Sequence, residues 1–380
     1  MDFDFTEEQE QLRDATRRWV TKAYDFERRK RIVKSGGFDA QAWGELAELG
    51  LFGLNVPDEH GGLGLGPVES MVVMEELGRG LVLEPYAAVA VIATGLLRWH
   101  APEALRSAWL PRLVAGQARV VLAHQEREAR YELQRVGARA VKQGAAYALT
   151  AAKSLVPVGD QADAFLVSAR LSGDVADRDG IGIFLVERQA GGVQARAYGL
   201  QDGSRAAEVS FKDSPATLVC DGSQGLAALE QAVDAGIAAL CAEAVGVMDR
   251  LFAITVDYLN TRKQFGVPIG TFQALRHRVA DMKMQLELAR SMSYFATLKL
   301  GEPAPERRRA LSMAKVQLGQ SMRFVGQQAV QLHGGIGVTD EYIASHYFKR
   351  LTCMEMTFGD TLHHLGEVSA RMEDTAGVFA

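Results

Sequence analysis

RKQFGVPIGTFQ, from Arg262 to Gln273, is the stretch of this 380-residue chain that most directly indicates its fold. Its GVPIG segment predicts a tight turn, because glycine and proline interrupt regular secondary structure. Thr271 is a suitable N-cap for a helix that follows the turn. Arg262 stands at the expected end of the helix before it, where a positive charge is favourable. The stretch therefore predicts two helices that are joined by a short turn.

Helical periodicity extends on both sides of this turn. Apolar residues recur at helical spacing from about Leu226 to Leu259, again from Thr271, and from near Pro303 to Leu332. Long helices that are joined by short breaks predict an antiparallel bundle.

The rest of the chain divides into two further regions. Before residue 120 the pattern is helical, and Thr6 and Gln9 have the spacing of a capping box. From 120 to 219, short apolar or alternating runs are separated by turn sequences such as SGD, DRDG and QDG, which is typical of a β-domain. No helical pattern interrupts these runs, which argues against a doubly wound parallel sheet. We therefore predict an α+β fold with an N-terminal helical domain (1–119), a middle β-domain (120–219) and a C-terminal helical bundle (220–380).

The composition is that of an ordinary globular protein, with 48% hydrophobic and 23% charged residues. The net charge of -5 is small and gives no reason to expect nucleic acid or a membrane as a partner. The longest nearly uncharged apolar run, Tyr86 to Leu97, is too short to cross a bilayer. Three scattered cysteines and an acidic N-terminus without a secretion signal lead us to expect a cytoplasmic protein.

QLHGGIGV, from Gln331 to Val338, is the second informative stretch. Paired glycines after a helix commonly form its C-cap. Glycine also lets a ligand approach the backbone closely. The stretch is not a dinucleotide-binding fingerprint of the GxGxxG type, because no strand precedes it.

Together, these stretches resemble the acyl-CoA dehydrogenase family. WGELAELGLFGLNVPDEHGGLGLG, from Trp43 to Gly66, and MEELGRGL, from Met74, are similar to the family's N-terminal segment, so the resemblance covers nearly the whole chain. It implies a helical domain, a β-barrel-like domain and a four-helix bundle, with FAD as the cofactor. It also implies that seven residues contact the adenosine and pyrophosphate of a neighbouring subunit's FAD: Arg262, Phe265, Gln273, Gln331, His333, Gly334 and Gly335.

Further segments resemble the small subunit of pimeloyl-CoA dehydrogenase-like enzymes. They are the MDFDFTEEQ start, ALCAEAVG around Cys241, FVGQQAVQLHGG, and HYFKRL near His346. Such subunits pair with a different acyl-CoA dehydrogenase-like subunit, as the related steroid-side-chain dehydrogenases do. The resemblance therefore implies an acyl-CoA substrate, a second subunit or a homo-oligomer, and an electron-transferring flavoprotein as electron acceptor.

The chain departs from the family at the catalytic base. In many members a glutamate in a YEGT-like segment removes the proton next to the thioester carbonyl. Against TFGDT in this chain, that glutamate falls opposite Phe358 or, with one inserted residue, opposite Gly359. The base position that other members use, in the first bundle helix, falls on Gly236. Asp360 is the nearest carboxylate and is our candidate catalytic base, or else it is the N-cap of a helix that begins near Thr361.

The segments that face the flavin ring in the family also differ. This chain has AHQEREARYEL from Ala123 and KSLVPVG from Lys153, with Leu155 where the family has a tryptophan. Three hypotheses follow. The chain completes a partner's FAD site within a heteromeric dehydrogenase, or it is a homo-oligomeric dehydrogenase with Asp360 as base, or it is a catalytically silent structural subunit.

We predict no metal site. His363 and His364 are adjacent, so their side chains diverge on a helix, and the chain has no HExxH pattern. His333 follows a helix and lies in the glycine stretch. It therefore either contacts a cofactor phosphate or caps the helix C-terminus.

Overall fold

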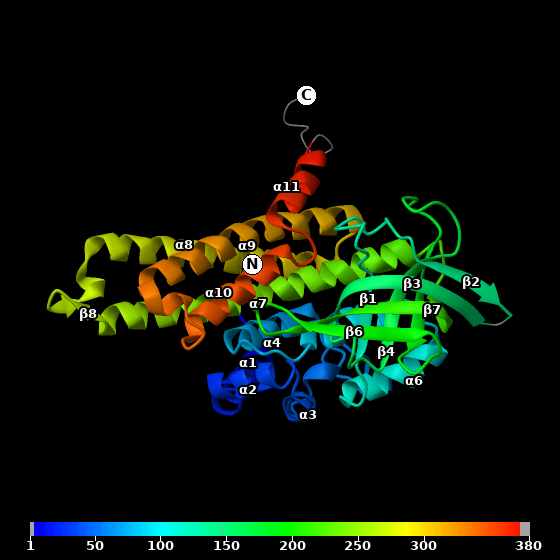
Figure 1. The fold of residues 1–380 in the computed structure, drawn as a ribbon, viewed down its shortest axis with the longest axis horizontal. Coiled ribbons are helices and arrows are strands. Elements are labelled where there is room, and N and C mark those ends of the chain that lie inside the picture. The colour runs from blue at the N-terminus through cyan, green and yellow to red at the C-terminus, as the bar shows by residue number, and fades with distance from the viewer. Residues whose placement is uncertain (1–3, 145, 373–380) are drawn as a thin grey trace. The chain divides into compact units, whose positions relative to one another are not determined.

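The computed structural model describes residues 4–144 and 146–372, which belong to two compact units. The first unit is drawn from residues 1–31, 67–82 and 237–380, and the second from residues 32–66 and 83–236. Figure 1 labels the helices and strands that the text names. No helix in the described ranges is long and apolar enough to cross a membrane. The division of the chain into three domains at residues 119 and 219 stays a prediction.

The first unit begins with helix α1 (Glu7–Ala23), whose predicted capping box is confirmed. The Gln9 backbone N–H donates to Thr6 Oγ1 over 3.3 Å, and the Thr6 backbone N–H donates to Gln9 Oε1 over 3.0 Å. α1 packs against α4 (Pro67–Arg79), where Arg17 pairs with the buried carboxylate of Glu76. Apolar contact and this ion pair together hold the two helices side by side.

Two glycines allow α4 to lie very close to the long helix α7 (Gly225–Thr261). A Cβ atom on Gly78 would lie 2.2 Å from the Glu243 carbonyl oxygen. One on Gly246 would lie 1.8 Å from the Glu75 carbonyl oxygen. Both distances are shorter than any van der Waals contact, so any larger residue at either position would push the helices apart.

The predicted C-terminal bundle is confirmed. Its helices are α7, α8 (Gln273–Leu298), α9 (Ala304–His333) and α10 (Ile343–Met356), followed by the shorter α11 (Thr361–Ala370). Figure 1 shows α8 and α9 side by side along their length. The predicted N-cap of the second helix is wrong, because α8 begins after Phe272 and no side chain caps it. The Thr271 hydroxyl instead donates to the Pro268 carbonyl over 2.7 Å, so it stabilises the preceding turn.

The second unit contains a seven-stranded sheet and the helices α3 (Ala40–Glu48), α5 (Thr94–His100) and α6 (Glu103–Val114). Helix α2 (Phe26–Lys34) contains the point where the two units divide. The strands are β1 (Val120–Ala123), β2 (Arg139–Gln143), β3 (Ala146–Pro157), β4 (Ala164–Arg170), β5 (Ile181–Glu187), β6 (Val193–Gly199) and β7 (Arg205–Cys220).

The sheet closes on itself. Its order is β1-β4-β2-β3-β7-β5, with β6 on β7, and β5 also pairs with β4. The ring β4-β2-β3-β7-β5 explains why these strands alternate apolar and polar residues or are wholly buried. The predicted fold class is therefore confirmed: a helical N-terminal part, a barrel-like middle part and a C-terminal bundle.

Candidate functional site

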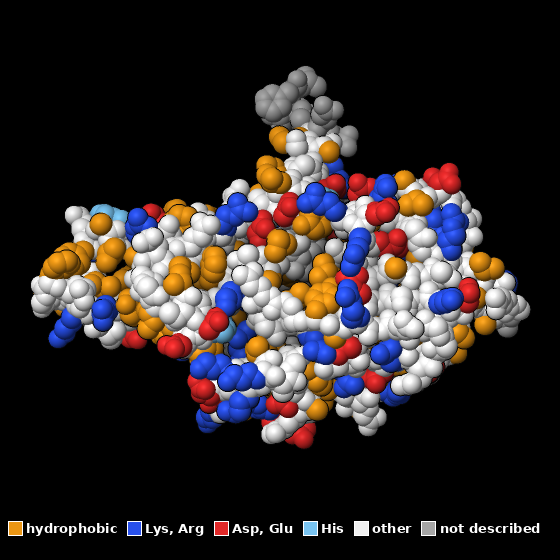
Figure 2. Space-filling model, in the orientation of Figure 1, with side chains coloured by type: hydrophobic (Ala, Val, Ile, Leu, Met, Phe, Trp, Pro, Cys, Tyr) orange, Lys and Arg blue, Asp and Glu red, His pale blue; other side chains and the backbone are white. Residues whose placement is uncertain are grey.

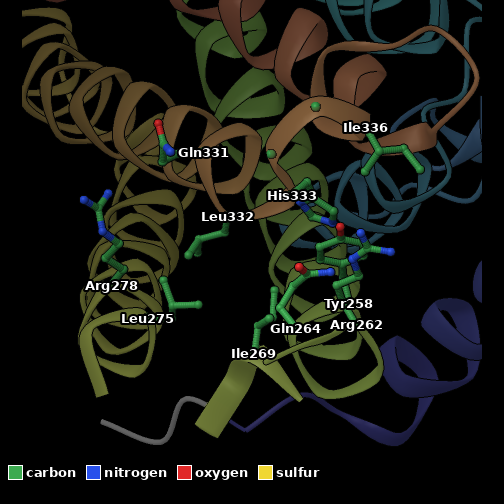
Figure 3. A pocket seen from close by; sticks show the side chains of 12 residues that line it. Tyr258, Arg262, Gln264, Ile269, Leu275, Arg278, Gln331, Leu332, His333 and Ile336 are labelled. Carbon is green, nitrogen blue, oxygen red and sulfur yellow. The ribbon is translucent and has the colours of Figure 1, made fainter. Parts of the chain in front are cut away.

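A pocket of about 650 Å³ lies at one end of the bundle, within the first unit. α7 ends there, α8 begins there, and α9 ends there. The lining residues are Tyr258, Arg262, Gln264, Ile269, Leu275, Arg278, Gln331, Leu332, His333, Gly334, Gly335 and Ile336. The pocket therefore brings together the two sequence stretches that carry the family resemblance, as Figure 3 shows.

Five of the seven predicted cofactor-binding residues line this pocket: Arg262, Gln331, His333, Gly334 and Gly335. Phe265 and Gln273 do not. Phe265 is 91% exposed in the hairpin of β8 (Lys263–Gln264) and β9 (Val267–Pro268), and Gln273 is exposed at the start of α8. Figure 2 shows hydrophobic side chains together with Lys and Arg on the surface at this end of the bundle. The adenine-side role of Phe265 and Gln273 stays a prediction.

The glycines at the end of α9 are required for different structural reasons or leave the backbone open. Gly334 has a φ of +61°, which ends the helix, and its N–H donates to the Gln331 carbonyl. A Cβ atom on Gly337 would lie 2.8 Å from the Val330 carbonyl oxygen, so packing requires that glycine. No atom lies within 4 Å of a Cβ built on Gly334 or Gly335, so their backbone faces open space. The stretch is thus both a helix end and an open backbone surface for a ligand.

The pocket carries positive charge that no carboxylate balances. Its walls contain Arg262 and Arg278, whereas none of its lining residues is an aspartate or a glutamate. Arg278 Nη1 donates to the neutral side chain of Gln328 over 2.7 Å. Among the described residues, neither guanidinium lies within 4.0 Å of a carboxylate oxygen. A pocket of this kind favours an anionic ligand.

His333 lines the pocket, but its imidazole ring is almost wholly buried. The side chain is only 2% exposed, and its ring lies 4.6 Å from the ring of Tyr258 and 5.2 Å from that of Tyr342. Nδ1 lies 2.8 Å from the Ala329 carbonyl oxygen, which only accepts, so Nδ1 carries a proton. Burial lowers the pKa of His333, so the ring is neutral at pH 7 and Nε2 keeps a lone pair.

Nε2 of His333 has no partner among the described residues. A neutral acceptor suits a hydroxyl group better than a phosphate oxygen, because a phosphate oxygen offers no hydrogen. Nε2 is also buried, so the structure shows no ligand contact for it, and the predicted cofactor role of His333 stays a prediction.

Asp360 lies in the turn between α10 and α11. Its carboxylate Oδ1 accepts the His363 backbone N–H over 2.8 Å and is the N-cap of α11. Positive φ values at Phe358 (60°) and Gly359 (114°) set the direction in which the chain enters this cap. The structure thus shows the capping role of Asp360. Its role as a catalytic base stays a prediction.

A buried lysine, Lys315, also holds the turn between α10 and α11. Nζ of Lys315 on α9 donates to the carbonyls of Met354, Glu355 and Gly359 over 3.0, 2.8 and 2.9 Å. The Glu355 carboxylate in turn accepts the N–H and the hydroxyl of Thr361 over 3.1 and 2.7 Å. The turn that would carry the family's base is therefore held by hydrogen bonds on both sides.

In the second unit, the segment around Leu155 corresponds in sequence to the family's ring-facing strand. Its polar groups form hydrogen bonds within this chain. The Leu155 N–H donates to the Tyr198 hydroxyl over 3.2 Å. The Glu208 carboxylate accepts from the hydroxyls of Tyr198 and Ser154 over 3.2 and 3.1 Å. Leu155 has a φ of +52° and is 45% exposed, and the pairing of β3 with β7 shifts register between Lys153 and Val156.

The neighbouring loop is tied to this segment by a buried ion pair. Lys153 Nζ lies 2.6 Å from the Glu126 carboxylate and also donates to the His124 carbonyl and the Ser168 hydroxyl. The same carboxylate accepts the backbone N–H of Gly137 over 2.8 Å. Glu126 therefore joins both ends of the loop between β1 and β2. The polar groups here point to partners within the chain rather than to a ligand.

Family models place this chain among known proteins. Residues 6–117 match the model described as "Acyl-CoA dehydrogenase, N-terminal domain", and residues 223–373 match "Acyl-CoA dehydrogenase, C-terminal domain". The mitochondrial isovaleryl-CoA dehydrogenase of Pongo abelii is 30% identical over 305 residues, which cover 76% of this chain and 71% of that protein. The chain belongs to the acyl-CoA dehydrogenase family.

Two solved structures are similar over nearly the whole chain. A variant of the Tcur3481–Tcur3483 steroid ACAD is 29% identical with a TM-score of 0.88, covering 97% of this chain and 99% of that one. The ChsE4–ChsE5 complex from Mycobacterium tuberculosis is 25% identical with a TM-score of 0.89, covering 99% and 100%. Both names join two different polypeptides.

Sequence reasoning missed Arg278. It stands five residues after the resemblance to the family's motif ends, in the sequence LRHR, where two arginines look alike. The signal is its spacing of three from Leu275, which places both on one face of α8. Leu275 and Arg278 both line the pocket, whereas Arg276 does not. Only the structure distinguishes the two arginines.

Proposed function

We propose that this chain is a subunit of an FAD-dependent acyl-CoA dehydrogenase that desaturates an acyl-CoA thioester between its α and β carbons. In this proposal it binds the adenosine and pyrophosphate half of an FAD whose ring lies against a different, related subunit. The observation that carries the proposal is the pocket of Arg262, Gln331, His333, Gly334 and Gly335. Membership of the family supports the reaction class.

The residues of the pocket fit the nucleotide half of FAD. Arg262 supplies a guanidinium without a carboxylate partner for a pyrophosphate. The open backbone at Gly334 and Gly335 allows a ligand to approach closely. The exposed Phe265 and Gln273 are then available to the adenine side of a nucleotide that a neighbouring subunit presents.

The ring-facing segment of the same chain does not fit a flavin ring. Leu155 replaces an aromatic wall, and its N–H is already bonded to Tyr198. The Ser154 hydroxyl donates its hydrogen bond to Glu208, so it is not available as a donor to a nitrogen or oxygen of the flavin ring. These features support a site shared with a partner that supplies the ring-facing wall.

The chemistry needs a base and a hydride acceptor. A carboxylate removes the α-proton, and the β-hydrogen leaves with its electron pair. FAD, when bound, would accept that hydride, and an electron-transferring flavoprotein would then reoxidise it. Because Asp360 caps α11 in this chain, we assign the base to the partner subunit. The resemblance to heteromeric small subunits and the two-polypeptide names of the similar structures support that assignment.

The test is to purify the chain alone and together with the product of the neighbouring gene. We expect flavin absorbance and dehydrogenase turnover only in the pair. Arg262→Ala and Gln331→Ala should lower the flavin content of the pair at least about tenfold, because each removes a contact to the pyrophosphate. Arg276→Ala is the matched control, since Arg276 does not line the pocket and should leave the flavin content unchanged.

Other outcomes identify the competing functions. A yellow chain that turns over alone would show a homo-oligomeric dehydrogenase and contradict the shared site. A pair whose flavin content and rate survive both substitutions would show that this chain is a structural subunit without a cofactor role.

Asp360→Asn separates the two roles of Asp360. Asparagine is also a good N-cap, so we expect the thermal unfolding midpoint to change little. Under the shared-site proposal, turnover of the pair stays within a few-fold of the wild type. A loss on the order of a hundredfold or more, with the fold intact, would instead identify Asp360 as the general base.

A further inference from the structure

A buried histidine, His364, lies against the turn between α10 and α11. It belongs to α11, which packs on α9, and is only 4% exposed. Its Nε2 lies 3.0 Å from the Phe358 carbonyl oxygen, which only accepts, so Nε2 carries the proton. Nδ1 then accepts from the Ser312 hydroxyl on α9 over 3.2 Å. Burial lowers the pKa of His364 to about 3, so the ring is neutral at pH 7, as these two hydrogen bonds require.

The ring of His364 fills the space beside Gly359. A Cβ atom on Gly359 would lie 2.6 Å from His364 Nε2 and 2.6 Å from His363 Cδ2, which is shorter than a van der Waals contact. The φ of Gly359 is +114°, a conformation that residues with a side chain rarely adopt. Its carbonyl accepts from Lys315 over 2.9 Å, so the backbone does not turn away without losing that hydrogen bond.

The two histidines differ in how firmly they are held. His364 is buried and hydrogen-bonded through both ring nitrogens, whereas His363 is only half-buried. Displacing the ring of His364 would take a partner from the Phe358 carbonyl and from the Ser312 hydroxyl. His364 is therefore the ring that resists a side chain at residue 359.

This space has a meaning for catalysis because of where the family's glutamate falls in this sequence. One register places that glutamate opposite Gly359, and the other places it opposite Phe358, whose carbonyl is bonded to the same ring. A carboxylate side chain that began at residue 359 would have to pass through the ring of His364.

We infer that His364 closes the base position of this chain: its ring occupies the space that a carboxylate side chain at residue 359 needs, so a substitution at residue 359 alone does not give this subunit a general base. The inference rests on the proposed function, in which the partner subunit supplies the base, and adds a physical reason for that division of roles. His364 itself takes no part in the proton or hydride transfer.

The experiment is a double-mutant cycle on the full chain, measured as the urea midpoint of unfolding. Gly359→Ala should lower the midpoint by about 1 M or more, because its methyl group meets the His364 ring and adopts a disfavoured φ. In the His364→Ala background the same substitution should lower the midpoint only about half as much, because the contact is gone and the backbone strain remains. His364→Asn should give the same coupling, since its amide reaches Ser312 but ends short of residue 359, and it serves if the alanine variant does not fold.

Two controls test whether the coupling is specific. His363→Ala should leave the effect of Gly359→Ala nearly unchanged, because the ring of His364 is still in place. Gly366→Ala should keep or raise the midpoint in both backgrounds, since no atom lies within 4 Å of the added Cβ and alanine favours a helix. A histidine that merely stabilised α11 would lower the midpoint without coupling to Gly359.

Two results would overturn the inference. An equal shift for Gly359→Ala in the wild-type and His364→Ala backgrounds would show that the ring does not fill the space at residue 359. Coupling of Gly359 to His363 in place of His364 would assign the closure to the wrong residue. Both results concern folding and are independent of flavin, whereas the proposed function fails if the pair keeps its flavin in Arg262→Ala.

Discussion

Replacing Arg170 with methionine is expected to lower the free energy of unfolding by about 3–5 kcal/mol, because several backbone carbonyls lose a charged hydrogen-bond donor. Arg170 on β4 is 1% exposed. Its guanidinium donates to five backbone carbonyls, which belong to Gln134, Val136, Val175, Asp177 and Asp179, over 2.6 to 3.0 Å.

These carbonyls come from two loops, one before β2 and one between β4 and β5. Methionine matches the length of the arginine stem but donates no hydrogen bond, so all five carbonyls lose a charged donor. Because whole proteins are stable by only about 5–15 kcal/mol, this loss is a large fraction of the stability of the chain.

The measurement is the urea midpoint of unfolding of the full chain, followed by circular dichroism. Lys142→Met is the control, because Lys142 lies on β2 of the same sheet and is exposed. Loss of an exposed charge should change the free energy of unfolding by less than about 1 kcal/mol. Equal midpoints for the two variants would mean that the carbonyl network does not stabilise the chain.

Replacing Lys315 with methionine is expected to lower the free energy of unfolding by about 3–5 kcal/mol as well, because three backbone carbonyls lose a charged donor. The amine donates to three carbonyls at the end of α10 and in the following turn, so the variant leaves all three without this donor. A positive charge at a helix C-terminus is also favourable, and this too is lost. Lys349→Met on α10 is the control. Its partner Asp340 is exposed, so this pair should contribute little to the free energy of unfolding.

Lys315 also predicts a pH dependence. Burial lowers the pKa of Lys315 in the folded chain from 10.5 to about 8. Between these two pH values the unfolded chain binds a proton that the folded chain has released, so this group makes the folded state more stable as pH rises. The full effect is about 3 kcal/mol.

The methionine variant lacks this titration. We therefore expect the difference in urea midpoint between wild type and Lys315→Met to widen from pH 8 to pH 10. Comparing the two chains at each pH removes the contribution of other groups that titrate in this range. A difference that stays constant or narrows would show that Lys315 is not a buried, titrating amine.

Some elements followed from short stretches of sequence. The capping box at Thr6 and Gln9 depends only on residues three apart, and it forms as predicted. The long helices of the bundle were visible because their buried faces repeat with the helical period. The predicted N-cap at Thr271 is wrong because α8 begins two residues later and the Thr271 hydroxyl instead donates to the carbonyl of Pro268.

The sequence predicted only part of the candidate site. Arg262 and Gln331 were recognised from motifs, but their meeting in one pocket depends on how α7, α8 and α9 end together. Asp360 was a carboxylate with two possible roles, and the positive φ values of Phe358 and Gly359 turn it into the helix cap. A sequence pattern does not disclose this, because the turn is shaped by Lys315, which lies 45 residues earlier (360 − 315).

The sequence by itself determined the family, the order of helical and β regions, and the two stretches that we propose to bind a nucleotide. These depend on local periodicity and on residue types at short spacing. Only the tertiary structure decided that Arg278 lines the pocket while Arg276 does not, that the buried Nε2 of His333 has no partner among the described residues, and that the Tyr198 hydroxyl accepts the N–H of Leu155. Each of these is a contact or an open space between segments far apart in the chain, which packing alone creates.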